Sequence, residues 1–106
     1  KLYLDDILDS IVKIEKYTRR MAFEEFRKDE KTLDACVRNL TILGEAVKNL
    51  PKDFKTKHAE IPWRKMVGMR NIVIHEYFGV KEKTLWKTIK EDLIPLKKFI
   101  KKLPQS

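Results

Sequence analysis

The chain contains little cysteine, glycine or proline, with one Cys, 3 Gly and 4 Pro among 106 residues. A single Cys cannot form an internal disulfide, and no Cys/His cluster has the spacing of a zinc site, so neither device stabilises a small core. With 42% hydrophobic and 38% charged residues, the chain is neither low-complexity nor disordered. This composition predicts a compact, helix-rich globule, and the lack of disulfide potential favours the cytoplasm.

Long apolar runs are also missing. No segment approaches the roughly 20 apolar residues that a membrane span needs, and no charged start followed by an apolar stretch suggests a signal peptide. We therefore expect no membrane association. The length corresponds to one small domain, so we predict a single domain over residues 1–106. Because the chain begins with Lys1 rather than Met, we expect a few native residues to precede it.

The positive charge is unevenly distributed. Residues 1–53 carry 11 basic and 11 acidic side chains, whereas residues 54–106 carry 13 and 5, so the whole net charge of +8 lies in the second half. Such asymmetry suggests a polyanionic partner, with nucleic acid first. A lysine-rich solvated surface is the alternative interpretation.

The spacing of the apolar residues predicts helices and no strands. Steps of three and four residues indicate a helix over residues 2–17, a short helical piece carrying Phe23 and Phe26, and a long helix ending before Pro51. After a polar connector, Pro62 suits the first turn of a helix over residues 63–77. A last helix from about Lys81 presents five apolar residues at helical spacing: Leu85, Ile89, Leu93, Leu96 and Ile100.

These elements predict an all-α fold, a four- to five-helix up-and-down bundle with short connections. We expect Pro95 to kink the last helix, which ends in a basic run from Lys97 to Lys102. Trp63, Trp86 and Cys36 are expected in the core, and His58 on the surface of the connector.

The most informative segment runs from Met69 to Gly79. On an ideal helix of about 100° per residue, Arg70 falls within the broad apolar arc and close to Tyr77. A guanidinium is costly to bury without partners, so this position faces a cleft or a subunit interface that supplies acceptors or a phosphate. Alternatively, Arg70 pairs with a buried carboxylate such as Glu45, and His75 is an ordinary capping residue.

Arg70 and His75 lie about 140° apart on an ideal helix, whereas Asn71 and His75 stack one turn apart. Two interpretations follow for Arg70 and His75. Either the helix distorts, or the site is composite, with a two-fold axis that brings Arg70 of one subunit toward His75 of the other.

The spacing of Arg70, His75 and Tyr77 resembles the R-x4-H-x-Y motif of HepT-like proteins in the HEPN superfamily. The similarity extends to Ile61-Pro62-Trp63-Arg64, Gly68-Met69-Arg70-Asn71, Tyr77-Phe78-Gly79-Val80, Trp86 and Glu91-Asp92-Leu93 before Pro95-Leu96. Upstream, Arg38-Asn39-Leu40 and Gly44-Glu45-Ala46 look like the third helix of that family, so the resemblance covers nearly the whole chain.

The resemblance implies a HEPN-like helical homodimer that acts as the endoribonuclease toxin of a prokaryotic toxin–antitoxin pair, without metal or other cofactor. Its partners would be RNA and an antitoxin, an MntA-type minimal nucleotidyltransferase that silences the toxin by AMPylation. Carried over by motif, Arg70 and His75 are catalytic, Asn71 and Glu45 are supporting residues, and Tyr77 is the modification site.

Two other functions remain open at this point. The chain could be a non-catalytic helical binding module that docks the nucleotidyltransferase or a nucleotide. A basic DNA-binding bundle is the third candidate, although no helix-turn-helix pattern is evident.

Overall fold

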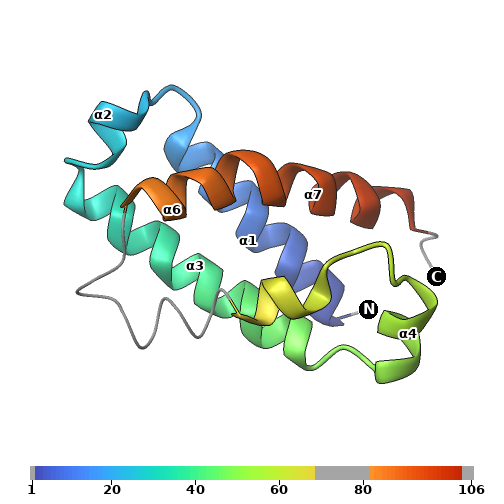
Figure 1. The fold of residues 1–106 in the computed structure, drawn as a ribbon. Coiled ribbons are helices and arrows are strands. Elements are labelled where there is room, and N and C mark those ends of the chain that lie inside the picture. The colour runs from blue at the N-terminus through green and yellow to red at the C-terminus, as the bar shows by residue number, and fades with distance from the viewer. Residues whose placement is uncertain (1, 69–81, 104–106) are drawn as a thin grey trace.

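The computed structural model describes residues 2–68 and 82–103. These residues form a helical bundle, and no strand occurs among them, as the apolar spacing predicts. Helices α1 (Leu2–Thr18) and α3 (Glu30–Lys48) run antiparallel and pack against one another, and the helical segment from Glu82 to Lys102 crosses them (Figure 1). The start of α1 and the end of α7 (Leu93–Lys102) lie at the same end of the bundle.

Polar side chains set the ends of the first helices. The Asp29 carboxylate accepts a hydrogen bond from the Thr32 amide at 3.1 Å, which caps the N-terminus of α3. The buried Thr18 hydroxyl donates to the Ile14 carbonyl at 2.9 Å in the last turn of α1. Between them, the one-turn helix α2 (Phe23–Phe26) inserts Phe26 fully into the core. The helices predicted at residues 2–17 and around Phe23 and Phe26 are therefore confirmed.

The last helical segment is not uniform. Helix α6 (Glu82–Lys87) leads into a π-helical turn, η2 (Thr88–Asp92), where the Leu93 amide donates to the Thr88 carbonyl. Pro95 has no amide hydrogen and displaces the carbonyl four residues earlier, which belongs to Glu91 inside η2. The irregularity predicted at Pro95 thus takes the form of a wider turn directly before it.

The wider turn also explains an apolar spacing. Leu85, Ile89 and Leu93 are separated by two steps of four, and each such step advances about 40° round an α-helix. A π-helical turn holds more residues and reduces this drift, so all three side chains face the core.

One continuous core contains the predicted apolar stripes. The fully buried side chains come from α1, α2, α3, the stretch at 63–68 and the last segment, and the largest are Phe26, Ile7, Ile11, Ile14, Leu40, Leu43, Met66, Leu93 and Leu96. Cys36 is buried among them, as predicted, and burial raises the pKa of its thiol to about 12. Within the described ranges, no helix is long and apolar enough to cross a membrane.

Candidate active site

Four of the predicted site residues, Arg70, Asn71, His75 and Tyr77, lie outside the described residues. The structure instead shows what holds the two ends of the segment that carries them. One end is the helical stretch at residues 63–68, and the other is α6. Both ends are fixed by aromatic side chains.

Trp63 anchors the first end. Its indole Nε1 donates to the carbonyl oxygens of Lys55, at 3.1 Å, and His58, at 3.0 Å. Lys55 lies in the last turn of α4 (Lys52–Lys57) and His58 is its C-cap, where carbonyls lack helical partners, although the His58 carbonyl also accepts from the Ile61 amide at 3.2 Å. Trp63 is the first residue of the helical stretch at 63–68, and its indole caps the C-terminal end of α4.

Trp63 also belongs to an aromatic cluster. We define this aromatic cluster as Phe54, His58, Trp63 and Phe99. The ring of Trp63 lies 6.0 Å from the rings of both Phe54 and Phe99, and the His58 ring lies 4.7 Å from Phe54 and 5.1 Å from Phe99. Because Phe99 comes from α7, the cluster ties the connector to the last helix.

His58, predicted on the surface of the connector, is half-buried there. Its side chain is only 22% exposed, with Nδ1 4.0 Å from the Glu60 carboxylate. The polar composition of the connector gives no indication of this packing. The sequence signal for it is the four-residue spacing of Phe54 and His58, which places both side chains on the same side of α4 and its C-cap. The prediction that Trp63 packs in the core is confirmed, whereas Trp86 is partly buried and packs against the core.

Further contacts join residues 63–68 to the bundle. The Lys65 ammonium lies 3.1 Å from the Asp92 carboxylate in η2, and Met66 is fully buried. Gly68 is the last described residue before the motif, and no other described residue lies within 4 Å of the position that a Cβ atom would take there.

The second end is held by Trp86. Its ring lies 4.8 Å from Phe26 and 6.2 Å from Phe23, and the Lys90 ammonium lies 4.5 Å above it. Phe23 and Phe26 of α2 therefore hold Trp86, and with it α6, against the bundle. The cation over the indole keeps positive charge beside this junction.

Glu45, the remaining predicted site residue, is half-buried on α3 and engaged in a polar interaction. Its backbone carbonyl also accepts a hydrogen bond from the Asn49 side chain at 3.0 Å. A supporting role toward Arg70 stays a prediction.

The basic end of α7 divides into two parts. Lys97 lies 2.6 Å from Glu15 of α1, so it serves as a structural ion pair. Lys98, Lys101 and Lys102 are exposed and available to an anionic partner. Elsewhere, no group of three metal-ligating side chains occurs within residues 2–68 and 82–103.

The described residues form an all-α bundle with exposed lysines at the end of α7. The family model described as "Ribonuclease HepT-like" matches residues 7–103, and the chain belongs to this HepT-like family. The match spans the described helices and the motif residues alike.

Named relatives agree with the assignment. The chain is 53% identical over 103 residues to "Probable ribonuclease HepT" of Thermococcus cleftensis, covering 97% of this chain and 94% of that protein. It is 44% identical over 103 residues to "Putative RNase TTE0752" of Caldanaerobacter subterraneus subsp. tengcongensis, covering 97% and 92%. No solved structure gives a significant match.

The Trp63 anchor is testable with a matched pair of variants. Trp63→Phe removes the indole donor from the Lys55 carbonyl, whereas the His58 carbonyl keeps its bond from the Ile61 amide, so we expect the free energy of unfolding to fall by about 1–3 kcal/mol. Trp86→Phe makes the same change in ring type at an indole with no hydrogen bond to the described residues, and should cost less. Urea unfolding followed by circular dichroism measures both. Equal losses would contradict a special role for the Trp63 hydrogen bonds.

Proposed function

We propose that the chain is a metal-independent endoribonuclease in which Arg70 and His75 act on the scissile phosphate. The observation that carries this is the family match over residues 7–103, which includes the motif residues. The relative sharing 53% identity bears a ribonuclease name, which supports RNA as the substrate.

The residue types suit this chemistry. RNA supplies its own nucleophile, because the 2′-hydroxyl can attack the adjacent phosphorus while the 5′ oxygen of the next nucleotide leaves. Such a reaction needs a group that moves a proton, and histidine is the side chain that most often does so at neutral pH, which suits His75 to the role. The guanidinium of Arg70 can bind the phosphate oxygens and stabilise the charge that develops on them.

The described bundle supports the proposal by its charge. The exposed lysines at the end of α7, together with Lys90 above Trp86, offer phosphate contacts to an RNA backbone. Such contacts are sequence-independent and weaken with salt. We therefore assign them to holding the substrate and not to selecting a sequence.

We further propose that the active form is a homodimer with a composite site. On an ideal helix Arg70 and His75 point about 140° apart, and a two-fold axis beside the helix would bring one subunit's Arg70 toward the other's His75. Asn71, one turn before His75, would supply a further hydrogen bond. Glu45 would act as a supporting carboxylate for Arg70.

The physiological setting that we propose is a prokaryotic toxin–antitoxin pair acting in the cytoplasm. The antitoxin would be a minimal nucleotidyltransferase of the MntA type. The Tyr77 oxygen would attack the α-phosphorus of ATP, lose its proton and release pyrophosphate. The bulky anionic AMP group, close to Arg70 in the motif, would then block substrate and offset the positive charge.

The activity is tested with chelator-treated protein and single-stranded RNA. We expect the chain to cleave RNA, and Arg70→Ala and His75→Ala each to slow cleavage by about 10²–10⁴-fold, the usual size of such contributions. Arg27→Ala, which breaks an exposed pair with Glu24 on α2, serves as the control and should cleave normally. Intact RNA with the unmodified chain, or normal cleavage by His75→Ala, would refute the nuclease. Retained partner binding without cleavage would then favour the non-catalytic binding module.

The regulation is tested by incubating the chain with ATP, Mg²⁺ and the nucleotidyltransferase encoded in the adjacent reading frame. Mass spectrometry should show AMP on Tyr77 and a matching loss of RNA cleavage. Tyr77→Phe should take up no AMP, whereas Tyr3→Phe, at an exposed tyrosine of α1, should be modified like the unaltered chain. AMP attached elsewhere, or cleavage unaffected by modification, would rule out this mechanism.

A further inference from the structure

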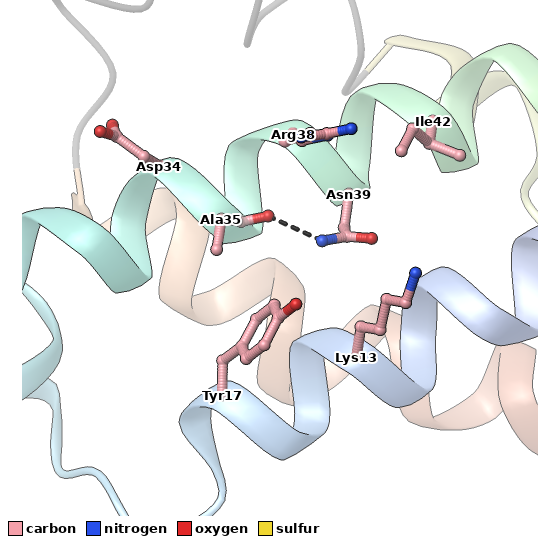
Figure 2. Close-up of a pocket in the computed structure, with 7 residues that line it drawn as sticks. All are labelled: Lys13, Tyr17, Asp34, Ala35, Arg38, Asn39 and Ile42. Atoms are coloured by element: carbon pink, nitrogen blue, oxygen red, sulfur yellow. Dashed lines mark hydrogen bonds between the residues drawn. The ribbon is translucent and has the colours of Figure 1, made fainter.

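A groove of about 480 Å³ runs between α1 and α3, formed entirely by described residues. Its volume falls within the range of small-molecule sites, about 300–1,000 Å³. Figure 2 shows the side chains of α1 and α3 that face one another across it. The lining residues are Lys13, Tyr17, Asp34, Ala35, Arg38, Asn39 and Ile42.

A buried amide whose oxygen has no donor among the described residues lies in the wall of the groove. Asn39 is only 6% exposed, and its Nδ2 donates to the Ala35 carbonyl at 2.9 Å. The Oδ1 atom points away from that carbonyl and accepts no hydrogen bond from the described residues (Figure 2). A buried acceptor without a partner costs free energy, so a ligand that donates to it is favoured.

A flat aromatic surface lies opposite. Tyr17 projects from α1 toward α3 and is 39% exposed, and Ile42 on α3 is 40% exposed (Figure 2). An exposed aromatic ring beside a hydrogen-bonding amide can stack a planar heterocycle while its edge is bound.

The charges of the groove complete the pattern. Arg38 is exposed and makes no ion pair with the described residues, and Lys13 shares its charge with Asp9 at 3.1 Å, a pair that is largely solvent-exposed. Asp34 also lines the groove, but it is engaged in an interaction of its own. Arg38 and Lys13 are therefore the two cationic side chains that line the groove.

We propose that this groove binds one nucleotide of a single-stranded RNA. The base stacks on Tyr17 and donates an N–H hydrogen bond to Asn39 Oδ1, while Arg38 and Lys13 contact the flanking phosphates. The inference rests on the proposed ribonuclease function and adds a substrate-holding site on residues that the motif does not include. A base in a duplex has no free face to stack on Tyr17, so this site predicts a preference for unpaired RNA.

Binding is measured with a 2′-O-methyl RNA oligonucleotide, which lacks the attacking hydroxyl and so cannot be cleaved through it. In fluorescence anisotropy we expect Tyr17→Ala and Arg38→Gln each to weaken binding about tenfold. Arg38→Gln should also lower the slope of log affinity against log salt by about one. Arg20→Gln, an exposed arginine beyond the end of α1 that does not line the groove, is the matched control.

Asn39→Leu separates binding from folding. Leucine is similar in size, favours helix and removes the unpartnered acceptor, so we expect the same or higher thermal stability together with weaker RNA binding. A purely structural role for Asn39 would produce the opposite pattern. Sedimentation of each variant tests whether the groove is covered by a second copy of the chain.

The outcomes distinguish this site from the catalytic proposal. Cleavage of RNA by the unaltered chain, with normal oligonucleotide binding by all three groove variants, would overturn the groove and leave the nuclease standing. Groove-dependent binding without any cleavage would refute the nuclease alone. Variants that change the oligomeric state and leave RNA affinity unchanged would show that the groove is an interface between copies.

Discussion

The arrangement around the candidate active site depends on one interaction, the donation of the Trp63 indole to the carbonyls of Lys55 and His58. These carbonyls lie at the end of a short helix, where no helical partner exists, and the same indole packs in the aromatic cluster with Phe99. One side chain thus joins the connector, the last helix and the start of the motif-bearing segment. A polar connector with few apolar residues acquires a defined course because its backbone carbonyls are satisfied there.

The bundle separates stability from function. Its apolar stripes and the Glu15–Lys97 ion pair hold α1 against α7. Four other cations are exposed and make no ion pair with the described residues: Lys98, Lys101 and Lys102 on α7 and Arg38 on α3. Because exposed ion pairs add little to the free energy of folding, we assign these exposed cations to binding and not to stability.

Most of the fold could be predicted from the apolar spacing, because helices such as α1 and α3 bury one regular face. Local features that depend on tertiary context could not be. The π-helical turn arises from Pro95 acting on a carbonyl four residues earlier, and His58 is half-buried because Phe99, far along the chain, packs on it. The α1–α3 groove combines Tyr17 and Asn39 from two helices, which no local pattern reveals. For the site, the motif spacing predicts Arg70, His75 and Tyr77, and both their roles and their arrangement stay predictions.

The central claim, that catalysis needs Arg70 and His75 from two subunits of an RNase dimer, is tested most directly by mixing inactive variants. Arg70→Ala and His75→Ala subunits are combined, heterodimers are isolated by different affinity tags, and RNA cleavage is measured. The composite site predicts that the heterodimer regains a substantial part of the activity, because one of its two clefts is intact. No recovery in verified heterodimers would contradict the account and place both residues in a site within one chain.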